Sequence, residues 1–297
     1  MTTYSLSTYQ QLAERLAALE KWLLEFGIRA GPTRIGHYQR TIDRLIVAQT
    51  AGTIYDTFTK EQVASIILSF GEIAELEFVR QHLANGPDIG LAEKLAAIVG
   101  GPVLPSAEDP NKSSNHARNI LFELTVAATL GSSSFPLLPA GICDLCTSFR
   151  GKRVIIECKR PQYATKVERA VKDGMRQLKK HLGPNPKQGF GLLALSASKV
   201  ITAGTKMIRA PNKEGIQEEL LSAGDEFIQS HRLSWSRQVP KGVIAMILHL
   251  GATGVAEASG QLYTGKQYFF CAIGRQPEDR VDLARAFFAQ FQSGSIR

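Results

Sequence analysis

Residues 141–161 predict two adjacent β-strands, and they read Gly141-Ile-Cys-Asp-Leu-Cys-Thr-Ser-Phe-Arg-Gly-Lys-Arg-Val-Ile-Ile-Glu-Cys-Lys-Arg-Pro161. The first strand is expected over residues 142–149 and the second over residues 153–159, which a proline soon follows. A two-residue loop that contains glycine, Arg150-Gly151, favours a tight hairpin between them. If these two residues form the loop, residue 149 faces residue 152, and by the same count Asp144 faces Glu157.

This hairpin would gather charged side chains on one face. Glu157 and Lys159 are two residues apart in one strand, so they point to the same face with Cα atoms roughly 6.6 Å apart. Asp144 and Glu157 would have Cβ atoms about 5 Å apart, which is unfavourable for two carboxylates unless a cation lies between them. A divalent ion bound by carboxylate oxygens would remove that repulsion.

A third acid precedes the hairpin on a predicted helix over residues 115–130. Glu123 lies at the margin of the apolar stripe that begins at Ile120, and not on the fully solvated face. Its carboxylate can therefore reach the same ion, directly or through water.

Helix and strand patterns alternate after the hairpin. A basic helix is expected over residues 164–182 and a buried strand from residue 190 to 196, which completes an α-β-β-α-β order. A helix at 215–229, strands at 243–250 and 268–273, and a last helix at 277–292 follow. This alternation predicts an α/β fold.

The first hundred residues have helical periodicity instead, with helices expected at 12–26, 38–48, 60–83 and 91–99. Turn-forming residues then dominate 101–115. We therefore expect a helical domain over residues 1–100, a linker or loop over 101–115, and an α/β domain over 116–297.

Composition narrows the classes of partner. The 297 residues carry 35 Lys plus Arg against 27 Asp plus Glu, a formal charge of +8 that favours polyanionic partners. No run approaches the roughly 18 apolar residues of a membrane helix, and no signal-peptide pattern opens the chain. Four cysteines are too few for a disulfide framework. We expect a cytoplasmic protein with no membrane partner.

The residues from about Asn115 to Ser196 resemble the PD-(D/E)XK, or restriction-endonuclease-like, nucleases. That family has an acid on its first core helix, an aspartate on the second core strand and an acid-x-Lys on the third, followed by a helix and a strand. Glu123, Asp144 and Glu157-x-Lys159 match in order and approximate spacing. The resemblance implies a mixed central sheet flanked by helices.

The resemblance also implies roles for these residues. Asp144 and Glu157 would be metal ligands, Glu123 an auxiliary ligand, the backbone carbonyl of Cys158 a further ligand, and Lys159 the catalytic lysine. The metal would be Mg²⁺ or Mn²⁺. Some members use a glutamine on the following helix, for which Gln177 is the candidate. The aromatic residue that some subfamilies place after that glutamine is replaced here by His181.

One other pattern has metal-binding or redox potential. Cys143 and Cys146 form a C-x-x-C, but no second C-x-x-C and no spaced histidine pair accompanies it. Because an odd separation in a strand sends side chains to opposite faces, ordinary packing is the preferred interpretation.

The function expected from these observations is a divalent-metal-dependent nuclease, a DNA endonuclease before an RNA one on the resemblance alone. The helical domain would recognise substrate, form a homodimer or bind a partner. The alternative is a catalytically silent nucleic-acid-binding or scaffold protein that keeps the nuclease fold. An interaction protein with an incidental acidic cluster is a third option, and it predicts that Asp144 and Glu157 lie on different faces.

Overall fold

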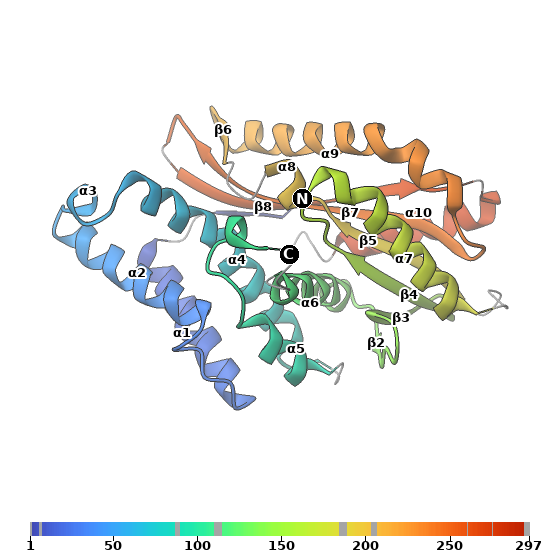
Figure 1. Cartoon of the computed structure of the whole chain (residues 1–297), viewed down its shortest axis with the longest axis horizontal. Coiled ribbons are helices and arrows are strands. Elements are labelled where there is room, and N and C mark those ends of the chain that lie inside the picture. Colours follow the sequence, from blue (N-terminus) through green and yellow to red (C-terminus); the bar gives the residue numbers. More distant parts are fainter. Residues whose placement is uncertain are drawn as a thin grey trace.

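A mixed β-sheet organises the chain, as Figure 1 shows. The computed structural model describes residues 2–5, 8–86, 90–109, 115–183, 189–202, 207–259, 261–274 and 276–293. Within these ranges the sheet has eight strands in the order β1-β8-β7-β5-β4-β3-β2, with β6 paired to β7. Their bounds are β1 (Thr2–Ser5), β2 (Leu137–Leu138), β3 (Leu145–Phe149), β4 (Lys152–Lys159), β5 (Gly189–Ser196), β6 (Ile208–Ala210), β7 (Val243–Ala256) and β8 (Gln261–Ala272).

The strand directions explain the α/β class. The pairs β4–β5, β5–β7 and β6–β7 are parallel, while the other neighbours run antiparallel. A parallel pair needs a long crossover, and here α7 (Val167–Leu182) connects β4 to β5 while α9 (Lys213–Trp235) lies between β6 and β7 in the chain. The α/β fold expected from the alternating patterns is confirmed.

The β3–β4 hairpin has the predicted register. Phe149 pairs with Lys152 and Leu145 with Ile156, so the next position places Asp144 beside Glu157. Arg150 and Gly151 have φ values of 48° and 72°, the two positive values that a tight hairpin turn requires. The first strand is shorter than expected, because β3 begins at Leu145 and not at residue 142.

Helices cover both faces of the sheet. On one face α7 packs against β4 and β5, and α9 packs against β7 and β8. On the other face lie α4 (Lys60–Leu83), α6 (His116–Ser132) and α10 (Glu278–Ser293). Because strand side chains alternate, Ile155 faces the α7 side and Ile156 faces the α6 side.

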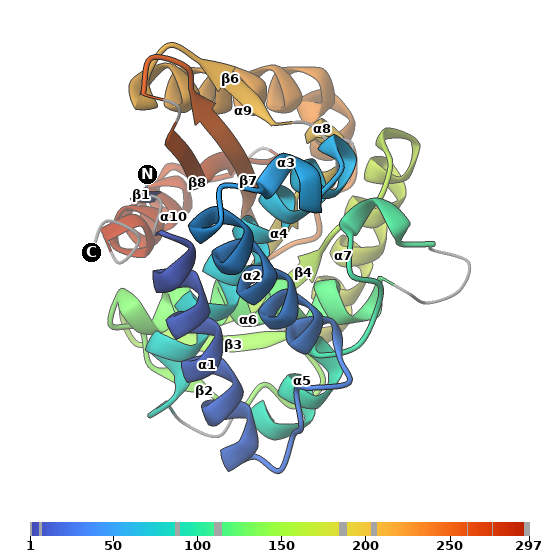
Figure 2. The same cartoon turned by 90° about the vertical axis from the view of Figure 1, so that its left-hand side faces the viewer.

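The helices predicted in the first hundred residues are present. They are α1 (Tyr9–Glu25), α2 (Arg34–Thr50), α4 and α5 (Leu91–Ile98), with a short α3 (Ile54–Thr57) between them. Figure 2 shows α1 and α2 side by side, outside α4. Apolar side chains of these helices form one continuous core cluster with the α6 side of the sheet. The boundary at 101–115 therefore does not divide the hydrophobic core.

Several segments differ from the expectation, among them β2, β6 and the first half of β8, where no strand was expected. Thr2–Ser5 forms strand β1 at the edge of the sheet, paired with β8, although no strand was expected before residue 142. The predicted linker contains a 3-10 turn at Pro105–Ala107 and the buried Glu108, while its residues 110–114 lie outside the described part. Over the described ranges, no helix has both the length and the apolar character needed to cross a membrane.

Candidate active site

An open cleft of about 540 Å³ lies between α6 and α7, where β4 ends. Its lining includes five of the six predicted site residues, which are Glu123, Asp144, Cys158, Lys159 and Gln177. The sixth, Glu157, lies behind the cleft surface and is fully buried. The structure therefore brings together the residues that the sequence singled out, from α6, the β3–β4 hairpin and α7.

The ammonium group of Lys159 lies among three oxygen atoms. Its Nζ atom is 3.6 Å from Asp144 Oδ2, 3.5 Å from Glu157 Oε2 and 3.0 Å from the carbonyl oxygen of Cys158. The backbone N–H of Cys158 donates to Asp144 Oδ2 at 2.7 Å, which orients that carboxylate. These oxygens form a small anionic pocket that already surrounds one positive charge.

The two hairpin acids repel each other in a partly dry environment. The pKa of Glu157 is raised to about 7, because burial and the nearby charge of Asp144 together outweigh the opposing Lys159 ammonium. A site in which one acid resists ionisation favours an added positive charge. Asp144 and Glu157 therefore lie opposite each other on one face of the hairpin, as predicted. The third interpretation, in which the two acids lie on different faces, does not agree with this register.

Glu123 approaches from α6 and has a partner that the sequence did not predict. Its carboxylate forms an ion pair with Lys94 of α5, and both side chains are largely buried. Burial and the charge of Asp144 raise the pKa of Glu123, whereas Lys94 lowers it. The helical region before residue 100 therefore supplies a cation to the site. No local pattern marks Lys94, because it precedes Glu123 by 29 residues on another helix.

His181 is a second residue whose role in the site was missed. Its Nδ1 atom is 2.8 Å from Glu157 Oε1, and its side chain is only 7% exposed. Burial, together with the charge of Lys180, lowers the pKa of His181, which favours a neutral ring. With its proton on Nδ1 the ring donates to Glu157 and fixes that carboxylate. In sequence His181 stood out only as a departure from the family pattern.

Gln177 and Gly174 show how α7 shapes the cleft. Gln177 lines the cleft, and its Oε1 atom is buried without a hydrogen-bond partner in the part of the chain described. Gly174 lies one turn earlier, where a Cβ atom would be 2.5 Å from Leu193 Cδ1 and 3.3 Å from Lys159 Cγ. Only glycine lets α7 approach the Lys159 side chain this closely.

Exposed cations surround the mouth of the cleft. Lys166, Arg169 and Arg176 of the basic helix line it. The side chains of Arg169 and Arg176 are 76% and 78% exposed, and Asp173 forms ion pairs with both. Solvent-exposed guanidinium groups of this kind are suited to contact phosphates along a nucleic-acid strand.

The interpretation of the C-x-x-C geometry was wrong. Cys143 precedes β3, so strand alternation does not apply to it, and both thiols pack in the core cluster on the α7 side. The Cys143 thiol donates to the carbonyl oxygen of Ala140 at 2.9 Å, and Cys146 Sγ accepts from Arg153 Nε at 3.1 Å. Both cysteines are free and buried, as ordinary packing requires.

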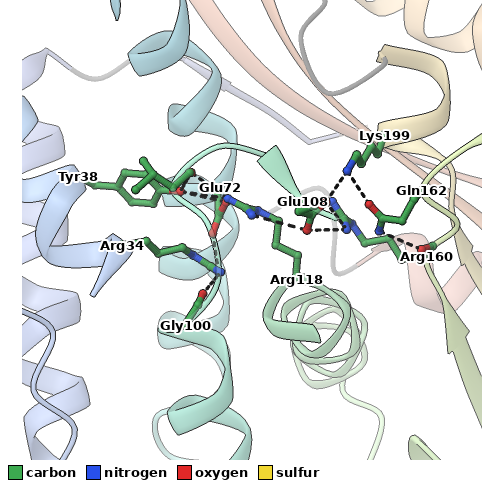
Figure 3. Close-up of polar contacts among 10 residues, drawn as sticks. Arg34, Tyr38, Glu72, Gly100, Glu108, Arg118, Arg160, Gln162 and Lys199 are labelled. Atoms are coloured by element: carbon green, nitrogen blue, oxygen red, sulfur yellow. Dashed lines mark hydrogen bonds and ion pairs between the residues drawn. The ribbon is translucent and has the colours of Figure 1, made fainter. Parts of the chain in front are cut away.

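Figure 3 shows a buried ionic network, and one of its members, Arg160, lines the cleft. Arg160 follows Lys159, lines the cleft, and donates to the fully buried carboxylate of Glu108 at 3.0 Å. Glu108 also binds Lys199 at 2.9 Å and lies 3.6 Å from Arg118. Arg118 in turn contacts Glu72 of α4 at 2.8 Å. The end of β4 is therefore tied to the helical region through charges.

No protein-family model, curated protein or solved structure matches this chain. Over the ranges described, no cluster of three or more His, Cys, Asp and Glu side chains is arranged as a metal site. The predicted ligand set combines two carboxylates of the hairpin with a main-chain carbonyl and has Glu123 as an auxiliary ligand. In the structure Glu123 forms an ion pair with Lys94.

Proposed function

We propose that this protein is a divalent-metal-dependent nuclease with a restriction-endonuclease-like core, and that DNA is its substrate. The observation that carries the proposal is the group of three oxygens, from Asp144, Glu157 and Cys158, around the Lys159 ammonium in a cleft with a cationic mouth. The preference for DNA comes from the family resemblance alone.

The residues present fit Mg²⁺ or Mn²⁺. Carboxylate and carbonyl oxygens are the ligands that these hard cations prefer, and the three oxygens already converge on a positive charge. Asp144, Glu157 and the carbonyl of Cys158 would hold the ion, and Glu123 would assist from α6. The chemistry that such an ion supplies is Lewis-acid polarisation of the scissile phosphate and a lower pKa of the attacking water.

The protein's own groups supply orientation and charge. The Lys159 ammonium can stabilise negative charge that develops on the phosphate or orient the attacking water. His181 and the Cys158 N–H hold the two carboxylates in place, so the acids need no rearrangement when substrate binds. The exposed arginines Arg169 and Arg176 can hold the flanking phosphates.

The alternative is a catalytically silent nucleic-acid-binding or scaffold protein. The observation that favours it is that Lys94 and Lys159 already neutralise the acids of the cleft without any metal. In that case the same cationic mouth would bind nucleic acid, and no phosphodiester bond would be cut.

A comparison of DNA cleavage by wild type and by the variant Lys159→Ala tests the proposal. Wild type, Lys159→Ala and the matched control Lys21→Ala, an exposed residue of α1, are each incubated with plasmid, single-stranded DNA and RNA in Mg²⁺, Mn²⁺ or chelator. Because a charge aimed at the reacting phosphate is lost, we expect Lys159→Ala to cut about 10²–10³-fold more slowly. Lys21→Ala should cut at the wild-type rate, and chelator should stop every reaction. Equal cleavage by Lys159→Ala, or cleavage that survives chelation, would exclude this mechanism.

A further inference from the structure

A second pocket of about 140 Å³ adjoins the cleft. It lies between α4 and the sheet, at the point where β5 ends, and its lining includes Ser196, Ser198 of α8 (Ser198–Thr202) and His249 of β7. Phe122 and Arg160 line both the pocket and the cleft. A ligand in the pocket would therefore lie next to a strand bound beside Lys159.

The pocket has aromatic walls and the volume of one ring. Phe78, Phe122 and His249 line it, and the centroids of the Phe122 and His249 rings are 5.4 Å apart. Its volume is close to that of an engineered protein cavity of about 150 Å³ that binds benzene. A single six-membered ring therefore matches the space.

Hydrogen-bond donors and acceptors converge inside the pocket. His249 is 2% exposed, its Nδ1 atom is 3.3 Å from Ser196 Oγ, and its Nε2 atom has no hydrogen-bond partner within the described ranges. A Cβ atom on Gly251 would lie 3.4 Å from Glu75 Oε1 and 3.6 Å from both His249 Cε1 and Ser198 Oγ. A carboxylate, an imidazole and a hydroxyl thus surround one point, and a buried ring nitrogen without a partner favours a ligand that supplies one.

This chemistry suits a nucleobase better than a phosphate. Glu72 and Glu75 line the pocket together with the cations Arg118, Arg160, Lys199 and Lys266. Buried acids already bind three of these cations, because Arg118 pairs with Glu72 while Arg160 and Lys199 pair with Glu108. A doubly charged anion would have to compete with these acids for the cations. A base offers flat apolar faces for the rings and an edge that carries both donors and acceptors for the polar groups. The volume selects a pyrimidine over a two-ring purine.

We propose that this pocket receives one pyrimidine base, unstacked from the strand whose phosphate lies beside Lys159. The inference rests on the proposed function, since it requires that nucleic acid occupy the cleft. It adds a specificity determinant, with His249 and Glu75 reading the base edge and Phe122 contacting its face.

Binding in chelator tests the base pocket apart from cleavage. Wild type is titrated with a short single-stranded DNA that carries pyrrolocytosine, a fluorescent pyrimidine, at one position, and with the same strand bearing an abasic site there. We expect a change in pyrrolocytosine fluorescence and about tenfold weaker binding of the abasic strand, because base stacking on aromatic side chains contributes that much.

Two variants locate the effect. Gly251→Ala adds a methyl group at ordinary contact distances and reduces the space, while His249→Phe keeps the ring and removes both nitrogens. Each should lose the fluorescence change and the tenfold preference over the abasic strand. Gly131→Ala on α6, whose Cβ would be 3.5 Å from the carbonyl oxygen of His82, is the control and should retain both.

The outcomes separate this inference from the proposed function. If wild type binds the abasic and the pyrimidine strands equally but still cuts DNA in Mg²⁺, the base pocket is wrong and the nuclease stands. An equal response to a strand that carries 2-aminopurine would overturn the size argument. If wild type binds neither strand but cuts DNA in Mg²⁺, the base pocket is wrong and the nuclease stands; if it neither binds nor cuts, both proposals fail.

Discussion

At the scale of single residues, Glu75 is a half-buried acid whose charge state changes near neutral pH. Its pKa is raised from 4.5 to about 7, because desolvation and the negative charge of Glu72 together outweigh the opposing charges of Arg160 and Lys266. The folded protein therefore holds the Glu75 proton at pH values at which the unfolded chain has already lost it. As the pH rises from about 4.5 to 7, this difference lowers the free energy of unfolding.

We expect Glu75→Gln to remove that loss. Urea unfolding of both proteins at pH 5 and pH 7 should show wild type losing on the order of 2 kcal/mol relative to the variant over this interval. His249, which burial keeps neutral with a pKa of about 3, titrates in the opposite sense but is present in both proteins. The exposed Glu93→Gln should follow wild type. Parallel pH profiles for wild type and Glu75→Gln would show that the Glu75 carboxyl is not desolvated as described.

At the scale of elements, the contact between α7 and β4 sets the position of Lys159. Gly174 is the point of closest approach, and the strand side chains beneath it are those of Leu193 and Lys159. The helical sequence pattern does not reveal this role, because a glycine inside a helix is expected only to lower helix propensity.

Gly174→Ala should displace Lys159. A methyl group 2.5 Å from Leu193 Cδ1 forces the helix or the side chains apart, at a cost of about 1–3 kcal/mol in unfolding free energy. A shift near 1 Å at a reacting group can slow catalysis about 100-fold, so DNA cleavage should fall much more than the folded fraction does. Cleavage rates and thermal melts are compared with those of Gly131→Ala. A Gly174→Ala protein that cuts at the wild-type rate would show that α7 does not position the lysine.

At the scale of the whole molecule, Glu108 joins parts of the chain that are far apart in sequence. Its carboxylate binds Arg160 after β4 and Lys199 of α8 and lies near Arg118 of α6, which itself contacts Glu72 of α4 (Figure 3). Arg34 of α2 continues this chain of charges through Glu72 at 2.6 Å. The network crosses from the first helices to the strand that carries the candidate catalytic lysine.

Glu108→Ala should destabilise the protein strongly. Its removal leaves the nearby cations buried without their shared acid, which typically costs about 3–5 kcal/mol. Glu168→Gln, an exposed acid of α7, should change stability by less than about 0.5 kcal/mol. Denaturant titrations measure both values. If Glu108→Ala lowers the free energy of unfolding by less than about 1 kcal/mol, the network contributes little to holding the helical region against the sheet.

Local patterns were sufficient for the elements and for the hairpin. Arg150-Gly151 sets the β3–β4 register, so the placement of Asp144 beside Glu157 follows from turn geometry alone. Helical periodicity likewise predicted α1, because its buried residues Leu12, Leu16, Leu19 and Leu23 form an apolar stripe. The error at Cys143 came from extending strand alternation past the residue at which β3 begins. The catalytic roles and the bound metal stay predictions.

Only the tertiary structure decided which distant charges meet. Three charged contacts join residues that lie on different elements. They are the contact of Lys94 with Glu123, that of His181 with Glu157, and the contacts of Glu108 with its neighbouring cations. The tertiary structure also decided that β1 pairs with β8, a strand far from it in sequence. Sequence periodicity reports which face of an element is buried, because burial acts on each element separately. It does not report which neighbour covers that face, since that choice depends on the packing of all the elements together.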